Sequence, residues 1–438
     1  MRPGLRIVLS MLSAALVGTV ILFMPVSHSG AVDISALDAV FTSVSALCVT
    51  GLTTVDTAIA WTPVGHVTIL ALIQLGGLGI MFLASAVALF IGRRLTLSSR
   101  MDAGQENSSL SSSDIVRTMK GIAKLTFTIE GILAAILTVR FYEAYDHDWG
   151  SALWHGVFHS VSAFNNAGFA LYSDSMTGFA TDPWITATLC VAIILGSFGY
   201  PVLAQLRKEF RHVHRWNMNT NLVIFMFVIL FFVGAVAFAA FEWSNPNTLG
   251  PMPIIDKIQT AFFHSVQARS SGFNTVDLAK ANPETLLVLD ILMFIGAGPG
   301  GTGGGIKVTT FAVLMFIVFA ELRGDSVVNI FGKRLSRAVH REAITIALFA
   351  VGAVMAATIA IVYISKERLD FVMFEVISAF ATVGSSTGLS ASLDPVSQTI
   401  LVVLMFVGRI GPLTIGASLA LKQRPPLYQF PKERPAIG

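Results

Sequence analysis

The sequence predicts an all-α polytopic membrane protein, made of four helix–pore-loop–helix repeats with eight transmembrane helices around a central pore of pseudo-fourfold symmetry. Three observations support this prediction. Hydrophobic residues make up 54% of the 438 residues and charged residues only 13%, with a mean hydropathy of +0.72, which excludes a soluble globular domain. The chain also contains eight long apolar stretches, and one weakly polar segment recurs four times between them.

The recurring segment places a Phe ten residues before a Gly in every copy. Such a repeat dictates the architecture, because each copy is expected to form the same structural unit. Each copy is too rich in Ser, Thr and Asn to face lipid, so we expect a short helix that enters the membrane and turns at the Gly. The copies run from Phe41 to Leu52, from Phe158 to Phe169, from Phe262 to Phe273 and from Phe374 to Ser385.

The eight apolar stretches are long enough to be membrane helices, since about 20 apolar residues cross a bilayer. The first follows Arg2 and Arg6 and is longer than the hydrophobic region of a signal peptide, so we expect a membrane helix there. The recurring segments fall between the two stretches of each successive pair. The predicted spans are residues 5–25, 66–91, 122–142, 184–206, 220–242, 285–320, 342–365 and 397–421; the predicted repeats are 1–92, 115–210, 216–322 and 340–422, with a cytoplasmic tail at 423–438.

A Pro marks the expected start of the second helix in every repeat, eleven to fifteen residues after the Gly. Pro is favoured in the first turn of a helix, where its missing N–H leaves no hydrogen bond unmade. A residue that can cap a helix precedes each Pro. The four Pro are Pro63, Pro183, Pro283 and Pro395, and the expected caps are Thr62, Asp182, Asn282 and Asp394.

The distribution of charge predicts the orientation. With both termini in the cytoplasm and the recurring segments entering from outside, most of the 29 Lys and Arg lie in cytoplasmic loops. The formal net charge of +3 therefore reflects membrane topology and not nucleic-acid binding. The outer side carries most of the acidic residues, which attract cations to the mouth of a pore. The basic residues assigned to the outer side are Arg140, Lys257, Arg269, Lys280, Lys366 and Arg368.

The residues around the four Gly suit a filter for cations. A cation must exchange its water shell for oxygen atoms at fixed positions, and backbone carbonyls provide these without the tight binding of a carboxylate. The flanking residues are small or hydroxylated, and none is acidic. The alternative is that the pattern records close packing of helices through small residues. The predicted filter comprises Val49, Thr50, Gly51, Asn166, Ala167, Gly168, Ser270, Ser271, Gly272, Thr382, Val383 and Gly384.

The sixth stretch is interrupted by a run of glycines from Gly296 to Gly305. This run cannot remain helical, so we expect a mobile loop that faces a cavity. It formally contains G-x-G-x-x-G, but a dinucleotide site requires a preceding β-strand, which is not expected here. Arg409 in the last stretch is a second unusual feature, because a charge at membrane depth needs partners. Its structural alternative is a cation that binds carbonyls at a helix end.

These residues resemble those of the Trk/Ktr/HKT superfamily of potassium transporters, and within it the KtrB membrane subunits, over essentially the whole chain. The motifs that carry the resemblance are Val49 to Leu52, Asn165 to Phe169, Arg269 to Thr275 and Thr382 to Gly384. Eight predicted helices favour KtrB over TrkH, which has two more. Ser271 and Ser385 depart from the usual motifs, which affects the expected degree of discrimination between K+ and Na+.

The resemblance implies K+ uptake across a bacterial plasma membrane, with Na+ as a candidate coupling ion in symport. It also implies a homodimer with a cytosolic, nucleotide-binding RCK ring of the KtrA type, and a dimer contact through the tail after Lys422. In the family the glycine loop is an intramembrane gate beneath the filter. The residues that match it are Gly298, Gly300, Gly301, Thr302, Gly303, Gly304, Gly305 and Lys307, together with Arg409.

Two other functions remain as alternatives: a weakly selective Na+/K+ transporter of the same fold, and a membrane enzyme that binds a nucleotide with the glycine loop. The sequence shows no catalytic constellation, so we expect no enzyme and no cofactor in this chain. His159 and His264 lie at similar positions in two copies of the recurring segment. We interpret them as polar anchors of the short helices and not as metal ligands.

Overall fold

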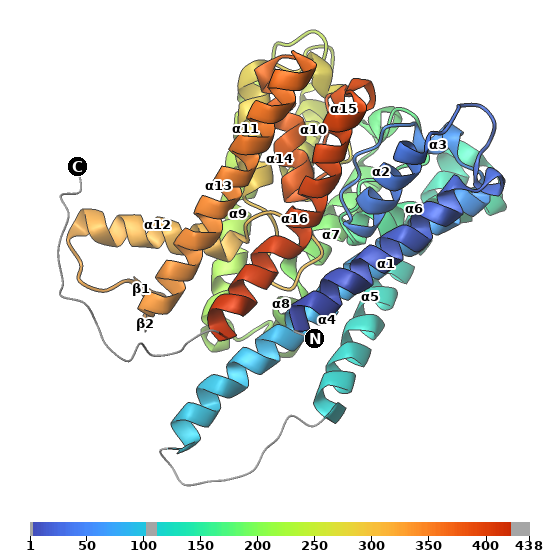
Figure 1. Ribbon diagram of the computed structural model, residues 1–438. Helices are drawn as coiled ribbons and strands as arrows, with labels where there is room; N and C mark the ends of the chain where they lie inside the picture. The colour runs from blue at the N-terminus through green and yellow to red at the C-terminus, as the bar shows by residue number, and fades with distance from the viewer. Residues whose placement is uncertain (1–2, 102–111, 422–438) are drawn as a thin grey trace.

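The computed structural model describes the backbone of residues 3–101 and 112–421, and the side chains of residues 8–84 and 116–411. The described chain is mostly helical and forms four helix–pore-loop–helix repeats (Figure 1). The predicted cytoplasmic tail lies outside the described residues. The first repeat contains α1 (Pro3–Phe23), α2 (Ala36–Leu47), α3 (Thr57–Ala60) and α4 (Pro63–Met101), and the second contains α5 (Ser112–Phe141), α6 (Trp149–Phe164), α7 (Pro183–Phe198) and α8 (Tyr200–Glu209).

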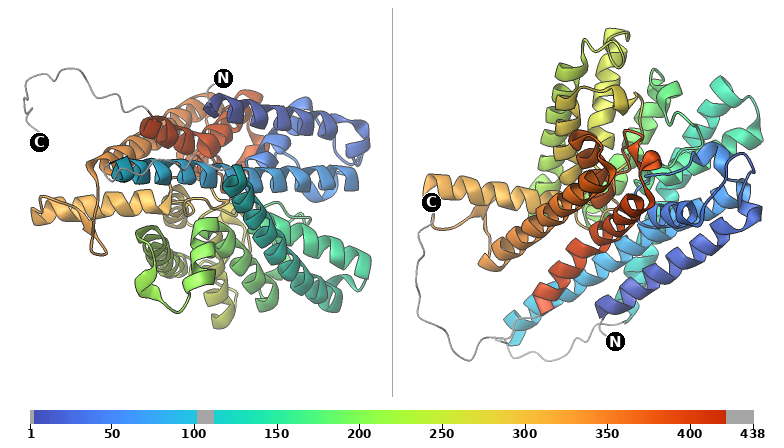
Figure 2. Two further views of the ribbon diagram at one scale, coloured as in Figure 1. Left: turned by 90° about the horizontal axis from the view of Figure 1, so that it is seen from below. Right: turned by 45° about the horizontal axis from the view of Figure 1, so that its top comes forward.

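The third repeat differs from the others in its second half. Its last helix, α12, extends away from the bundle and is followed by a two-stranded antiparallel hairpin (Figures 1 and 2). The third repeat contains α9 (Met218–Glu242), α10 (Ile254–Gln267), α11 (Pro283–Phe294) and α12 (Val308–Arg323), the hairpin is β1 (Asn329–Ile330) and β2 (Lys333–Arg334), and the fourth repeat contains α13 (Arg337–Ser365), α14 (Leu369–Ala381), α15 (Leu389–Ser392) and α16 (Pro395–Leu421).

Four of the described helices are long and apolar enough to cross a membrane, and a bent pair would make a fifth. The pair is α7 and α8, which meet at Gly199 with a bend of 101°. The predicted sixth span is likewise divided between α11 and α12 by the glycine loop. The prediction of a continuous helix in the fourth span was therefore wrong, because Gly199 has a positive φ of 82° and ends α7.

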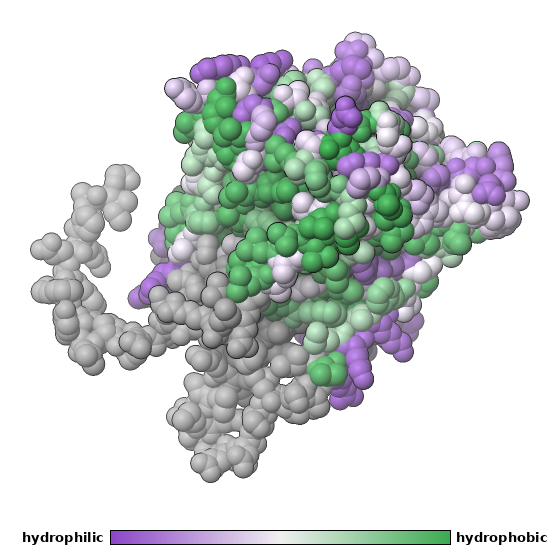
Figure 3. Space-filling model, turned by 45° about the vertical axis from the view of Figure 1, so that its right-hand side comes forward, coloured by the Kyte–Doolittle hydropathy of each residue, from purple (hydrophilic) through white to green (hydrophobic). Residues whose placement is uncertain are grey.

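The four short helices α2, α6, α10 and α14 pack inside the bundle in a cyclic order. Each lies against the first helix of its own repeat and against the second helix of a neighbouring repeat, through the pairs α4–α6, α7–α10, α11–α14 and α16–α2. The last pair closes the circle between the fourth repeat and the first. Hydrophobic side chains cover a broad band of the outer surface, with hydrophilic residues toward its edges (Figure 3). This surface suits a bilayer around the bundle.

The predicted Pro starts are confirmed, since α4, α7, α11 and α16 begin at the four Pro. Two of the four predicted caps are also confirmed. Asp182 accepts hydrogen bonds from the backbone N–H groups of Trp184 and Ile185, and Asp394 does the same for its own helix. Asn282 occupies the N-cap position of α11, but its side chain donates to the carbonyl of Phe241 and makes no cap bond. The Thr62 hydroxyl likewise donates to the carbonyl of Val26, which follows α1.

The third short helix is out of register with the others by one residue. Phe41, Phe158 and Phe374 are fully buried, but Phe262 is 38% exposed and its neighbour Phe263 is buried instead. The spacing of ten residues therefore does not mark equivalent positions in this copy. In this copy Phe263, His264 and Ser265 correspond to Phe158, His159 and Ser160, so the buried Phe lies nine residues before the Gly and not ten.

Candidate cation-conducting site

The four glycines of the predicted filter meet at one cavity. The cavity has a volume of about 200 Å³ and is lined by Gly51, Gly168, Gly272 and Gly384. Tyr172 also lines it. Each Gly has a positive φ, between 69° and 95°, which a residue with a side chain rarely adopts. Segments more than 300 residues apart in sequence are thus brought to one point by the cyclic packing of the short helices.

The glycines form a closed ring with the carbonyls of the neighbouring repeats. A Cβ atom on any of the four would overlap the carbonyl oxygen of the residue that precedes the Gly of the next repeat. Four carbonyls therefore face the ring from residues one position before the glycines. The contacts are Gly51 with Ala167, Gly168 with Ser271, Gly272 with Val383, and Gly384 with Thr50.

The backbone before the ring adopts an unusual conformation. Val49, Asn166 and Thr382, each two residues before a Gly, have positive φ values of 56°, 60° and 49°. For β-branched Val and Thr this left-handed conformation is strained, and such strain clusters at functional sites. Ser270, the equivalent residue of the third repeat, does not share it. The sequence identified these positions by their size but gave no signal of the strain.

The chain beyond the ring is held by polar side chains of the short helices. In every repeat, such a side chain bonds to the residue three positions after the Gly. This confirms His159 and His264 as anchors, and it adds Asp38 and Glu375, which the sequence had not assigned this role. The pairs are Asp38 with the Thr54 hydroxyl (2.5 Å), His159 with the Leu171 N–H (3.2 Å), His264 with the Thr275 hydroxyl (3.0 Å) and Glu375 with the Thr387 N–H (2.8 Å).

The glycine loop between α11 and α12 contacts residues that precede the ring glycines, whereas the anchors described above hold the residues that follow them. Its Gly298 and Thr302 N–H groups donate to the carbonyls of Ser197 (2.9 Å) and Gly196 (3.1 Å) at the end of α7. Cβ atoms on Gly303 and Gly304 would overlap Ser270 and Thr382, two of the residues that precede the ring. The loop therefore lies against the predicted filter, and its glycines make that close approach possible.

Two cations, the buried Arg409 and the half-buried Lys307, bind carbonyls of this loop. Arg409 is 4% exposed, and its guanidinium donates to the carbonyl of Thr302 and, at 3.4 Å, to that of Gly76. Lys307 Nζ donates to the carbonyl of Gly303 at 2.7 Å. The Thr302 hydroxyl in turn accepts a hydrogen bond from the Asn166 amide at 2.6 Å. The structure thus brings the predicted gate residues and the filter together in one network.

Glycines in the second helices allow three of the short helices to approach closely. Cβ atoms on Gly76, Gly196 and Gly408 would overlap the carbonyls of Leu47, Phe164 and Phe380, each four residues before a ring Gly. Gly76 and Gly196 are therefore helix-packing residues. In the third repeat, Gly296 stands at this position and instead faces the carbonyl of Gly304, because the glycine loop folds back there.

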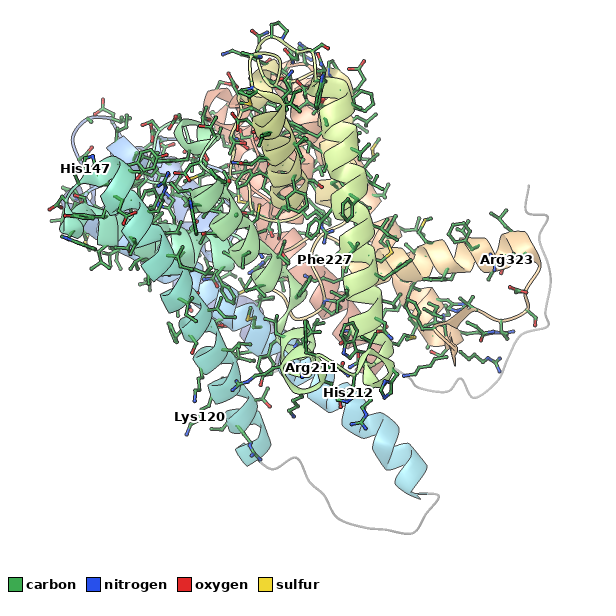
Figure 4. All side chains as sticks on the ribbon, turned by 180° about the vertical axis from the view of Figure 1, so that it is seen from behind. Lys120, His147, Arg211, His212, Phe227 and Arg323 are labelled. Atoms are coloured by element: carbon green, nitrogen blue, oxygen red, sulfur yellow. The ribbon has the colours of Figure 1, made fainter. Side chains whose placement is uncertain are left out.

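Arg269 was wrongly assigned to the outer side of the membrane. It is fully buried, and its guanidinium lies 3.6 Å from the ring centre of Phe227 and 4.4 Å from that of Phe231, both on α9. Figure 4 shows Phe227 at mid-height on α9. The assignment failed because α10 runs inward, so a residue three positions before the Gly lies at the depth of the ring and not at its mouth.

The chain is similar to known cation transport proteins over nearly its whole length. The TrkH family model, described as a cation transport protein, matches residues 8–424. The Ktr system potassium uptake protein B of Vibrio alginolyticus is 37% identical over 434 residues, which is 99% of this chain and 94% of that protein. The potassium/sodium uptake protein NtpJ of Enterococcus hirae is 29% identical, over 92% of this chain and 90% of that protein.

A solved structure shows the same fold. The crystal structure of the potassium transporter TrkH from Vibrio parahaemolyticus matches with a TM-score of 0.76 at 19% sequence identity. The match covers 97% of this chain and 85% of that one.

Proposed function

The chain belongs to the TrkH family of cation transport proteins, and from this premise we propose that it mediates K+ uptake through the ring of carbonyls around its four glycines. The relative from Vibrio alginolyticus is named a potassium uptake protein and is similar over nearly the whole chain. The observation that carries the proposal is the closed order of the ring, in which each Gly faces the carbonyl before the next Gly.

The chemistry of the ring suits a weakly hydrated monovalent cation. The carbonyls of Thr50, Ala167, Ser271 and Val383 replace water oxygens, and none of these residues adds a charge that would trap the ion. The short helices direct the negative ends of their dipoles toward the same region. Asp56, which also lines the cavity, adds negative potential at the outer mouth and attracts cations there.

We assign control of conduction to the glycine loop with Lys307 and Arg409. The loop lies against Ser270 and Thr382, and both cations bind its carbonyls. Positive charge on the inner side of the ring opposes the passage of cations. Movement of the loop away from Arg409 would open the path for the ion. A regulator must therefore break the hydrogen bonds from Arg409 and Lys307 to the loop carbonyls.

A weakly selective Na+/K+ transporter is the second candidate within the family. The relative from Enterococcus hirae is named for both ions. Ser271 and Ser385, which depart from the usual motifs, are the residues at issue. The Ser385 hydroxyl donates to the Gln267 side chain at 3.0 Å, so it is directed toward α10. The Ser271 hydroxyl is buried without a hydrogen-bond partner.

The structure argues against a nucleotide site in the glycine loop. Phosphates are bound by free N–H groups of such loops, but the N–H groups of Gly296, Gly298 and Thr302 already donate to protein carbonyls. The loop is also packed against the ring segments, with no room for a side chain at Gly303 or Gly304.

We further propose the assembly and orientation that the family resemblance implies. The chain forms a homodimer in the plasma membrane, with both termini in the cytoplasm, and a cytosolic RCK ring controls it. The name of the Ktr system relatives supports a system of more than one protein. Lys120 and Arg211 lie at the opposite end of the bundle from His147 (Figure 4), which agrees with basic residues on the cytoplasmic side.

The deciding experiment is ion uptake by the reconstituted chain. We expect uptake of K+ and Rb+ in proteoliposomes, with weak competition by Na+ and with a rate that changes when the cytosolic partner is added. Equal competition by Na+ would favour the weakly selective alternative. Absence of K+ and Rb+ uptake both with and without the partner would contradict the proposed function.

A further inference from the structure

Glu130 is a buried carboxylate behind the filter that the proposed conduction path does not use. It lies on α5 with 4% exposure, at the level of the second ring segment. Its Oε1 accepts a hydrogen bond from the Asn165 amide at 2.9 Å, and its Oε2 accepts one from the Gln74 amide at 3.3 Å. The Asn165 amide also donates to Gln74 Oε1 at 3.0 Å. Three side chains from two repeats therefore form a closed triangle.

The equivalent positions in the first and third repeats lack a carboxyl group. In three repeats, a Ser of the short helix donates to a carbonyl of the first helix, which identifies Ala15, Glu130 and Phe231 as equivalent residues. Among these three repeats, only the second has a carboxyl group at this position. The bonds are Ser43 to Ala15 (2.8 Å), Ser160 to Glu130 (2.7 Å) and Ser265 to Phe231 (2.8 Å).

The side chain at this position contacts the residue three positions before the ring Gly. In the second repeat Glu130 binds the amide of Asn165, and in the third Phe231 lies under the guanidinium of Arg269. The first helix thus supports each of these two ring segments from behind with a different chemistry. A carboxylate that accepts hydrogen bonds from two amides is a strong and directional support.

Asn165 transmits this support to the ring and to the gate. A Cβ on Gly77 would overlap Asn165 Oδ1, so the amide is confined between α4 and the carboxylate. The next residue is the left-handed Asn166, whose side chain reaches Thr302 of the glycine loop. The residue after that is Ala167, whose carbonyl faces Gly51 in the ring.

We propose that Glu130 is a positioning residue that sets the discrimination between K+ and Na+. It acts by fixing the Asn165 amide and, through it, the backbone that presents the Ala167 carbonyl. Discrimination between two cations of equal charge depends on how firmly the carbonyls are held, so a loosened second segment accepts Na+ more readily. This inference rests on the proposed function, since it concerns the same ring.

The test compares Glu130→Ala and Glu130→Gln with the wild type and with Glu321→Ala, which removes an exposed carboxylate on α12. Uptake of Rb+ is measured in proteoliposomes over a range of Na+ concentrations. We expect Glu130→Ala to lower the ratio of Na+ to Rb+ half-saturation constants by about tenfold, the equivalent of about 1.4 kcal/mol. Glu130→Gln retains one acceptor for Asn165 and should give an intermediate ratio, while Glu321→Ala should match the wild type.

A purely structural role would change the result in a different way. It would lower the amount of protein in the membrane and the maximal rate, with the ratio of constants unchanged, and that outcome would overturn the inference. If Glu130→Ala cannot be recovered, a wild-type ratio in Glu130→Gln overturns it equally. Wild-type protein without any Rb+ or K+ uptake would instead overturn the proposed function, and this inference with it.

Discussion

At the residue scale, the four ring glycines are constrained twice, by their positive φ and by the carbonyl that each faces. The first constraint concerns the backbone of the residue itself, and the second concerns its neighbour in the next repeat. A substitution therefore disturbs two ring segments at once. We therefore expect one added methyl group at the ring to change ion selectivity more than the same group elsewhere.

We expect Gly168→Ser to lower the discrimination between K+ and Na+ by at least about tenfold, because the new side chain displaces the Ser271 carbonyl. Rb+ uptake under Na+ competition, in cells that lack other K+ uptake systems, measures this. Gly131→Ala is the matched control, since a Cβ on this helical glycine of α5 meets nothing within 4 Å. Unchanged competition in Gly168→Ser would contradict the assignment of the ring as the filter.

Arg409→Ala should give a faster and less controlled transporter. The variant removes the guanidinium that binds the Thr302 carbonyl, and with it the positive charge on the inner side of the ring. The measurement is the uptake rate with and without the cytosolic partner. We expect the rate without the partner to rise toward the rate with it. If both the rate and its response to the partner stay as in the wild type, Arg409 is only a structural cation.

The residues of the site could be predicted from the sequence to different extents. The glycines were predictable, because their spacing and small neighbours recur. Asp38 was not predictable. In the alignment of the four copies Thr42 corresponds to His159, and Asp38 lies one helical turn before Thr42. Arg269 was assigned to the outer mouth although it is buried at the depth of the ring, since a linear count of charges does not show that a short helix carries its C-terminal end inward.

At the scale of elements, the glycine loop replaces a helix packing contact that the other three repeats make. Gly76, Gly196 and Gly408 let a second helix touch the end of a short helix, whereas Gly296 faces its own loop. The sequence predicted the break in the helix from the density of glycine. It did not predict that the broken segment would be fixed by backbone hydrogen bonds to α7, because those partners come from another repeat.

We expect Gly304→Ala to increase uptake in the absence of the partner. A Cβ at this position overlaps the carbonyl of Ala381 and the side chain of Thr382, so the loop must move away from the ring. The comparison is with Gly352→Ala on α13, where a Cβ meets nothing within 4 Å. An unchanged basal rate for Gly304→Ala, at normal protein levels, would show that the loop position does not limit conduction.

Asp182 joins α5 to the start of α7, and Asp182→Ala should lower thermal stability. The carboxylate caps α7 and also accepts hydrogen bonds from Arg140 (2.8 Å) and Tyr145 (3.0 Å). Loss of the cap alone costs about 1 kcal/mol. The measurement is the midpoint of thermal aggregation in detergent. Asp394→Ala, which removes a cap without an ion pair to another helix, should give a smaller decrease; an equal decrease would mean that the Arg140 contact contributes nothing.

At the scale of the whole molecule, the ring exists only because the repeats close on themselves. The pairs α4–α6, α7–α10, α11–α14 and α16–α2 are the same contact made four times. The count of repeats and their order were predictable from one recurring segment. The register shift in α10 and the bend at Gly199 were not, because each is a local accommodation that leaves the cyclic packing intact.

The orientation of the whole bundle can be tested with introduced cysteines. We expect His147→Cys to react with a membrane-impermeant maleimide in intact cells and Lys120→Cys to react only after permeabilisation, because these residues lie at opposite ends of the bundle and the basic end should face the cytoplasm (Figure 4). The native Cys48 and Cys190 are buried, so background labelling should be low. The reverse pattern would place the glycine ring toward the cytoplasm and the gate toward the outside, which would contradict the proposed direction of uptake.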